Sequence, residues 1–338
     1  MNMPEPIISR AIVAYDKDIP EIPGRCPWEK PTQHLVKDER EANGWKVEDG
    51  RRPSQLLLVP KLRDKVDRWR EKDYPGASDV SKNLFQYWFS EDHEVTGFSS
   101  PFRYHFCQRE AIETLVWLVE IAGYKDLKDL IEIFADIYQN NLWEQNIQFH
   151  TTTEGIRKME RYIPELKNKG VQDLPPENLR RCAFKMATGS GKTWVMAMAI
   201  VWSYFHKKMI PTSNLSTNFL IVAPNVIVYQ RLEKDFANNR VFHEIPLIPP
   251  AWQGQFSLKV VLRDDVSEPD PSGNLFLTNI QQLYEFREQE WSPTNAVEVL
   301  LGKKPVQDLA SSGQRSMLER LKSLKDLVVI NDEAHHVH

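Results

Sequence analysis

The stretch of the sequence with the clearest chemistry is ATGSGKT at positions 187–193. Its two glycines allow the backbone to turn tightly, so that successive N–H groups can converge on phosphate oxygens. A helix starting at Lys192 would add the positive end of its dipole. Lys192 could then reach the β- and γ-phosphates of a nucleotide, and the Thr193 hydroxyl could ligate Mg²⁺. The stretch predicts a phosphate-binding loop made by Thr188, Gly189, Ser190, Gly191, Lys192 and Thr193.

A pair of acidic residues lies near the end of the sequence, in LVVINDEAH at positions 327–335. The apolar residues predict a strand that delivers Asp332 and Glu333 at its carboxyl end, where open α/β sheets bind ligands. Asp332 suits a place in the shell of Mg²⁺, and Glu333 suits the positioning and deprotonation of an attacking water. With the upstream loop, the pair predicts an ATP hydrolase that uses Mg²⁺. A P-loop kinase is the competing class of enzyme. It would need a site for the molecule that accepts the phosphate and commonly a mobile lid, and no sequence motif indicates either.

Alternating strands and helices have to position these side chains. We expect a short strand at 182–187, then a buried helix at 192–208. Further strand-like apolar runs lie at 219–224, 258–262, 275–279 and 327–331. Short apolar runs separated by helices favour a parallel sheet that is covered on both faces. The fold class predicted is therefore α/β, a nucleotide-binding sheet layer.

The upstream part of the chain has a different composition. Residues 1–100 are rich in Pro, Trp and charge, and we interpret them as an accessory region. Aromatic residues at 85–89 could stack on bases, although a role in the core of a small domain is the stronger interpretation. A stripe of apolar residues from Ala111 to Val119 predicts a helix ending near Gly123. Two more helices are expected at 126–145 and 152–170.

Composition limits the classes of protein that fit. The chain has 338 residues, 41% of them hydrophobic, and a net charge of −4, which excludes a globally basic nucleic-acid coat but allows a local basic groove. Three widely spaced cysteines form no disulfide or zinc pattern, so a reducing cytoplasm is expected. The longest apolar run, at 194–202, is too short to cross a bilayer, and no membrane role is expected.

MATGSGKT followed by NDEAHH resembles the motifs I and II of superfamily 2 helicases and translocases. The chain is most similar to the Res subunit of type III restriction enzymes, although Met186 stands where the general loop pattern has a glycine. The resemblance implies a RecA-like P-loop lobe that hydrolyses ATP with Mg²⁺ and moves along DNA. FRYHFCQREAI resembles the Q motif, in which Gln108 would read the adenine edge. Motifs Ia and Ib would follow the nucleic-acid backbone with Pro224, Asn225, Gln230, Thr278, Asn279 and Gln281, although Asn225 and Thr278 could also simply cap helices.

The resemblance also divides the chain. It implies an accessory region at 1–100 and a first RecA-like lobe at 101–338, with the Q-like motif at 102–123 and motifs I to II at 181–338. Gln108 and Lys192 are 84 positions apart (192 − 108), farther than in most of the family. We therefore expect a helical insertion at 125–180. Gln108 could alternatively be a solvated helix residue.

The histidines after the acidic pair have two interpretations. The family resemblance implies that His335 senses the nucleotide and relays its state to the rest of the motor. A metal site built from His335, His336 and His338 is the weaker alternative, because a strand-to-helix turn would not bring them together. Two details favour double-stranded DNA over RNA as the nucleic acid along which the motor moves. They are Met-Ala-Thr at 186–188, at the start of the glycine loop, and His336, directly after the residues DEAH.

In the family, motif II lies inside the first lobe, and a second lobe with an arginine finger follows it. We therefore expect these 338 residues to be an N-terminal piece of a larger protein with poor activity alone. A DNA methyltransferase (modification) subunit is an expected partner. The alternative is a non-catalytic nucleic-acid- or partner-binding module that retains motor motifs.

Overall fold

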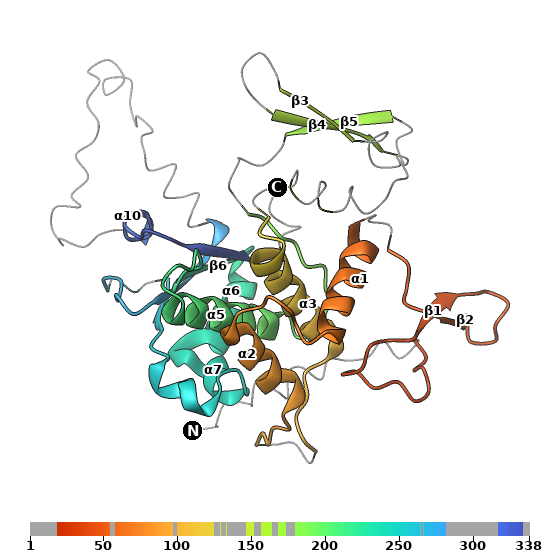
Figure 1. Ribbon diagram of the computed structural model, residues 1–338, viewed down its shortest axis with the longest axis horizontal. Coiled ribbons are helices and arrows are strands. Elements are labelled where there is room, and N and C mark those ends of the chain that lie inside the picture. The colour runs from red at the N-terminus through yellow and green to blue at the C-terminus, as the bar shows by residue number, and fades with distance from the viewer. Residues whose placement is uncertain are drawn as a thin grey trace.

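The computed structural model describes residues 19–54, 58–96, 100–124, 129, 133, 147–151, 157–163, 168–173, 180–263, 265, 267–281 and 317–333, and all structural statements concern these residues. Their strands form a two-stranded, a three-stranded and a four-stranded sheet (Figure 1). The four-stranded sheet has the order β7-β8-β6-β9 and lies at the centre of the nucleotide-binding part.

The central sheet is parallel throughout, as predicted. Its strands are β6 (Asn218–Ala223), β7 (Lys259–Val261), β8 (Asn274–Asn279) and β9 (Val328–Asn331). Ala223 pairs with Asn279 and Val222 pairs with Asn331, so the carboxyl ends of β6, β8 and β9 lie at one edge. All six residues of β8 are buried, which explains its continuous apolar run. This edge receives the loops that carry the predicted chemistry.

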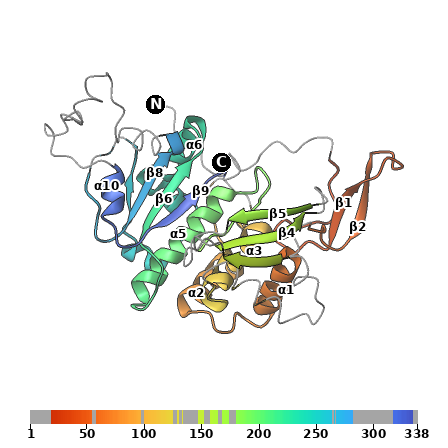
Figure 2. The same cartoon turned by 90° about the horizontal axis from the view of Figure 1, so that it is seen from above.

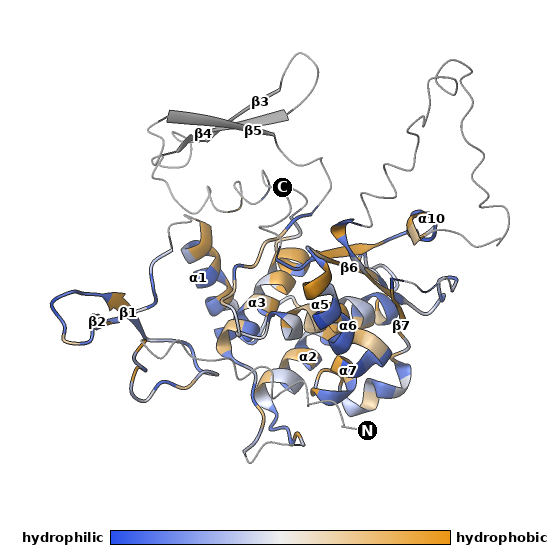
Figure 3. Ribbon diagram, turned by 180° about the vertical axis from the view of Figure 1, so that it is seen from behind, coloured by the Kyte–Doolittle hydropathy of each residue, from blue (hydrophilic) through white to orange (hydrophobic). Residues whose placement is uncertain are grey.

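Helices cover both faces of the sheet. Side chains alternate along each strand, so successive residues of β6 pack against helices on opposite faces. Phe219 and Ile221 of β6 belong to the large core cluster that contains helix α5 (Lys192–Met209). Leu220 and Val222 instead pack with helix α10 (Met317–Lys322) on the opposite face. Figure 2 shows α5 and α10 on the two sides of the sheet, and Figure 3 shows β6 coloured as strongly apolar.

The remaining elements after α5 complete this layer around the sheet. They are the helices α6 (Val226–Phe236) and α7 (Arg240–Glu244), with the short 3₁₀ turns η4 (Ala237–Asn239) and η5 (Pro250–Gln255). Phe236 and Phe242 are buried in the same core cluster as α5. The predicted helix at 192–208 and the four predicted strands after it are confirmed.

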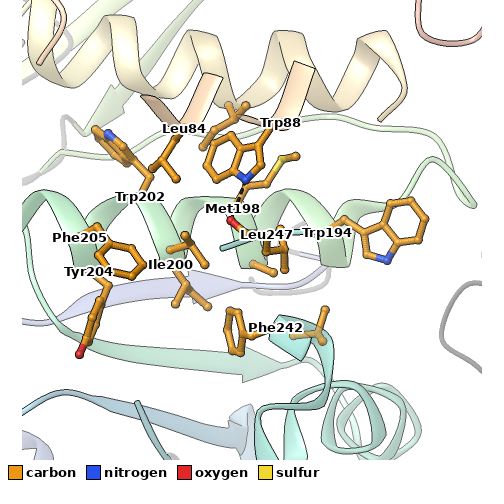
Figure 4. Packing of buried hydrophobic residues seen from close by; sticks show 14 of the residues in the cluster. Leu84, Trp88, Trp194, Met198, Ile200, Trp202, Tyr204, Phe205, Phe242 and Leu247 are labelled. Carbon is orange, nitrogen blue, oxygen red and sulfur yellow. Dashed lines mark hydrogen bonds between the residues drawn. The ribbon is translucent and has the colours of Figure 1, made fainter. Parts of the chain in front are cut away.

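The upstream helices share this core instead of forming one of their own. They are α1 (Leu58–Glu71), α2 (Asp79–Ser90), α3 (Phe106–Val116) and the π-helix η2 (Trp117–Ile121). The hairpin of β1 (Gln33–Lys37) and β2 (Trp45–Asp49) precedes them and has no residue in the core cluster. Trp88 of α2 packs against Met198 and Leu247, and its indole N–H donates to the Leu247 carbonyl at 2.8 Å (Figure 4). Phe85 and Trp88 are each only 1% exposed, so neither can stack on bases. These two aromatics are core residues, as expected, but the core that they join is shared with α5 and is not that of a separate small domain.

The strand expected at 182–187 is not formed. These residues are irregular and mostly exposed. The preceding backbone is anchored by Tyr124, whose hydroxyl donates to the Arg181 carbonyl at 3.3 Å, while Arg180 Nε donates to the Tyr124 carbonyl at 2.9 Å. Those bonds hold the segment against the end of the α3–η2 helix rather than against a strand. Within the described residues, β9 is therefore one of the two outer strands of the sheet, and β7 is the other.

The prediction of a helix at 152–170 is wrong. β4 (Arg157–Ile163) and β5 (Asn168–Asp173) form an antiparallel sheet with β3 (Ile147–Thr151), so the insertion is not wholly helical. Pro164 in the middle of the expected helix would remove a backbone donor and clash with the preceding turn, which leaves strand pairing as the better alternative. The helix expected at 126–145 lies almost entirely outside the described residues. No helix among those described is long and apolar enough for a bilayer.

Candidate functional site

The glycine loop has the conformation that its sequence predicts. Gly189 and Gly191 both have φ of 78°, a left-handed conformation that favours glycine. The Ser190 hydroxyl donates to the Ala187 carbonyl at 2.7 Å, and α5 begins at Lys192 with Gly191 as its N-cap. A Cβ added at Gly191 would overlap the side-chain amide of Gln108. The loop therefore turns directly into the start of a long helix, where the Trp194 N–H donates to the Gly191 carbonyl at 3.0 Å.

The acidic pair lies directly against this loop. Lys192 Nζ forms an ion pair with Glu333 Oε1, joining residues 141 positions apart in the chain. The Asp332 N–H donates to the Val222 carbonyl at 3.1 Å, so the pairing of β9 with β6 continues to the base of the acidic pair. The two strongest sequence signals thus meet at the carboxyl edge of the sheet, as predicted.

Asp332 is held by an arginine that the sequence did not single out. Arg231 Nη2 of α6 donates to Asp332 Oδ2 at 2.7 Å, and the Glu333 N–H donates to Oδ1 at 3.0 Å. The Asp332 side chain is 3% exposed, whereas that of Arg231 is 49% exposed. The sequence places Arg231 next to the predicted contact residue Gln230. Nothing in the sequence indicates a partner 101 positions away.

The residues at this edge fit a magnesium-bound triphosphate. Asp332 supplies a carboxylate and Thr193, in the first turn of α5, supplies a hydroxyl, both of which are the oxygen ligands that Mg²⁺ prefers. Gly189 and Gly191 present backbone without Cβ atoms at the point where phosphates would approach. Thr188 is exposed, and Ser190 is half-buried within the same turn. Among the described residues, no group of three His, Cys, Asp or Glu side chains forms a separate metal site.

Gln108 is buried against the loop rather than solvated. Its side chain donates from Nε2 to the Ser190 carbonyl at 2.9 Å and accepts the His105 N–H at Oε1, also at 2.9 Å. The residue is 1% exposed, so the solvated-helix interpretation is wrong. Both ends of the amide are engaged within the protein. The structure thus brings Gln108 to the phosphate-binding loop, and its contact with adenine stays a prediction.

Helix α3, which carries Gln108, is held by a buried ionic network. The Glu113 carboxylate is fully buried and accepts hydrogen bonds from Arg70 Nε, Arg109 Nε and the Tyr74 hydroxyl, at 2.6 to 2.7 Å. Burial of the Tyr74 hydroxyl, together with the charge of Glu113, raises the pKa of that tyrosine well above its usual value. The accessory helix α1 therefore fixes α3, and α3 fixes the loop.

The side chains beside the loop have pKa values set by burial. Desolvation raises the pKa of the Cys107 thiol, whose sulfur lies 4.0 Å from the Ser190 carbonyl oxygen. Desolvation also lowers the pKa of His105, the N-cap of α3. Both shifts favour the uncharged forms near neutral pH.

The residues of motif Ia lie at the start of α6. Asn225 is the N-cap of α6 and accepts the Val228 N–H at Oδ1, 2.9 Å away, which confirms the capping interpretation for this residue. Pro224 is half-buried, and Gln230 is exposed on the same helix. The loop that follows β6 is therefore accessible at the carboxyl edge of the sheet.

The residues of motif Ib divide differently. Thr278 and Asn279 are buried, with exposures of 0% and 1%, because they are the last residues of the buried strand β8. Neither side chain can contact nucleic acid in this arrangement, whereas Gln281 is exposed just beyond. His335, His336 and His338 lie outside the described residues.

A parallel sheet with a glycine loop at the start of α5 and an acidic pair after β9 defines a RecA-like P-loop nucleotide-hydrolase lobe. The chain belongs to the type III restriction enzyme res subunit family, whose model matches residues 104–338. No curated protein and no solved structure matches the chain. The family contains helicase-like ATPase motors that generally use ATP and Mg²⁺. Its Res subunits act on DNA and associate with modification subunits.

Proposed function

We propose that this chain is the ATP-binding and ATP-hydrolysing motor portion of a translocase that acts on double-stranded DNA in type III restriction. The observation that supports this most directly is the ion pair between Lys192 and Glu333. It joins the phosphate-binding loop to the acidic pair at the carboxyl edge of a parallel sheet, where nucleotides bind in such folds. Glu333 thus offers Lys192 a negative charge of the kind that a triphosphate would supply.

The proposed roles follow from the chemistry of each side chain. The backbone of Thr188, Gly189, Ser190 and Gly191 wraps the phosphates, and Lys192 neutralises the β- and γ-oxygens. Thr193 and Asp332 hold Mg²⁺, which when bound supplies neutralisation of charge on the phosphate oxygens. Glu333 orients the attacking water and accepts its proton. His335 is proposed to relay the state of the nucleotide to the rest of the motor.

We place the DNA track over the exposed loop residues at the same edge of the sheet. Asn225 and Gln230 after β6, and Gln281 after β8, are exposed there. Pro224 shapes the first loop, while Thr278 and Asn279 support the second from within the sheet. A DNA methyltransferase subunit is the proposed partner, and the cytoplasm the proposed location.

We further propose that these 338 residues alone bind ATP weakly. Lys192 and Asp332 are both paired with other protein groups, Glu333 and Arg231. Bound nucleotide and Mg²⁺ have to displace both pairs before the phosphates can be held. Each displacement reduces the apparent affinity for the nucleotide.

Nucleotide binding tests the proposal directly. Titration with a fluorescent ATP analogue and Mg²⁺ should give saturable binding to the native chain and none to Lys192→Ala. Lys185→Ala is the matched control, because it removes the same charge from the exposed segment just before the loop. Equal affinity of the native chain and Lys192→Ala would refute the assignment of the loop.

A further inference from the structure

The carboxylate proposed to hold Mg²⁺ is fully engaged by the protein itself. Arg231 binds one oxygen of Asp332 at 2.7 Å, and the Glu333 N–H binds the other at 3.0 Å. The Asp332 side chain is 3% exposed, so its pair with Arg231 covers it from solvent. A metal ion can reach this carboxylate only after the Arg231 guanidinium has moved away.

Arg231 is placed to reach a second kind of partner. It lies on the exposed face of α6, with Ile227 four positions before it and Lys234 three positions after it, which is helical spacing. Asn225 caps the start of this helix, so the face begins at the carboxyl edge of the sheet (Figure 2). A guanidinium carries five N–H donors in a planar fork. Half of this side chain faces solvent, where a phosphate could bind it.

We infer that Arg231 is a switch residue shared between Asp332 and the phosphate backbone of duplex DNA; this inference rests on the proposed function. Without DNA, Arg231 pairs with Asp332 and keeps Mg²⁺ out. A DNA phosphate that approaches the exposed face of α6 competes for the same guanidinium, because Arg binds carboxylate and phosphate with the same fork. Once Arg231 has turned to the phosphate, Asp332 is released to Mg²⁺.

Thermodynamic linkage makes the coupling reciprocal. If DNA tightens the binding of magnesium nucleotide by some factor, magnesium nucleotide must tighten the binding of DNA by the same factor. The coupling passes through one side chain, so one substitution should remove it. It acts on the metal-dependent part of nucleotide binding, since Arg231 touches Asp332 and not Lys192.

The test measures affinity for a fluorescent non-hydrolysable ATP analogue, with Mg²⁺ or with EDTA, and with or without a 40-base-pair duplex. For the native chain in Mg²⁺, the duplex should tighten binding by about tenfold, within the usual range for coupled sites. Arg231→Gln should bind the magnesium nucleotide about tenfold more tightly without DNA, as expected from removal of one charge-assisted hydrogen bond. The duplex should then add nothing. Arg231→Lys, which keeps the charge, should retain most of the coupling.

Lys234→Gln is the matched control, because it removes the same charge from the same face of α6, one turn from Arg231. It should weaken DNA binding without tightening nucleotide binding in the absence of DNA. The inference is overturned if Arg231→Gln and Lys234→Gln behave alike, or if the duplex still tightens binding to Arg231→Gln. It is also overturned if single-stranded RNA, and not the duplex, produces the coupling. If the native chain binds the nucleotide and Lys192→Ala does not, such a result leaves the proposed function standing. If no variant binds it, both fail.

Discussion

Two groups of ion pairs in this chain differ in how they are enclosed. Glu113 in the accessory part is fully buried, and its arginine partners Arg70 and Arg109 are 13% and 25% exposed. At the sheet edge, Lys192 and Glu333 are 25% and 23% exposed, and Arg231 is 49% exposed. The first group is centred on a carboxylate with no exposed surface, whereas in the second group only Asp332 is buried, at 3% exposed, and its partner Arg231 is half exposed. We propose that the first is a structural support and the second is a set of contacts that ligands exchange.

The same difference explains how the accessory part serves the site. The Glu113 network joins α1 to α3, and α3 places Gln108 against the Ser190 carbonyl. A closed network of buried charges costs free energy to break but holds one geometry. The predictions that follow are ordered from the largest expected effect to the smallest.

Breaking the closed network should have the largest effect. Glu113→Ala should lower the free energy of unfolding by about 3–5 kcal/mol, because it removes the buried carboxylate that Arg70 and Arg109 share and leaves Arg70 with Asp67 alone. Urea denaturation followed by circular dichroism measures this. Glu71→Ala, at the exposed end of α1, should change the value by less than about 0.5 kcal/mol. A similar small change for Glu113→Ala would mean that the network is not a support.

Removing the contact between α3 and the loop should have an intermediate effect. Gln108→Ala leaves the Ser190 carbonyl and the His105 N–H without their partner, so ATP affinity should fall by about tenfold, equal to about 1.4 kcal/mol. Because the contact is to the loop, GTP affinity should fall by the same factor. A loss confined to ATP would show instead that Gln108 reads the adenine edge.

The smallest effect concerns acid stability at the other end of α5. Glu120 lies at a cavity of about 320 Å³. Burial alone would raise its pKa, but hydrogen bonds from His206, Ser81 and Ser78 outweigh burial and lower it. A lowered folded-state pKa contributes stability above the unfolded value of about 4.3, and this is lost as the pH falls further.

The matching experiment compares acid unfolding of Glu120→Gln with the native chain. Between pH 5 and pH 3, the free energy of unfolding of the variant should fall less steeply with falling pH than that of the native chain. Glu91→Gln, an exposed carboxylate just after α2, should leave the native slope unchanged. Parallel acid profiles for Glu120→Gln and the native chain would contradict the lowered pKa.

Sequence patterns predicted the parts of the molecule that depend on local apolar runs. The runs at 219–224, 275–279 and 327–331 became β6, β8 and β9. Parallel pairing puts Glu333 at the carboxyl edge of the sheet, where Lys192 at the start of α5 forms an ion pair with it. The irregular segment at 182–187 could not be predicted, because its place depends on hydrogen bonds to Tyr124.

The contacts that tune the site were equally beyond the sequence. The bond from Gln108 to Ser190 spans 82 positions, and the pair between Arg231 and Asp332 spans 101. Neither residue type is unusual on the surface of a helix, so only the packing of α3 and α6 gives these side chains their partners. The strands β4 and β5 were missed because apolar residues at mixed spacing in 152–170 fit a helix about as well as a strand.

The central claim is that Lys192 and Asp332 hold one magnesium-bound triphosphate between them. The most direct test compares the affinity of Asp332→Ala and Lys192→Ala for a non-hydrolysable ATP analogue, with duplex DNA present throughout, in Mg²⁺ and in EDTA. The account predicts that Lys192→Ala loses binding in both conditions, whereas Asp332→Ala loses affinity only when Mg²⁺ is present. An equal loss for Asp332→Ala in EDTA, or no loss in Mg²⁺, would contradict it.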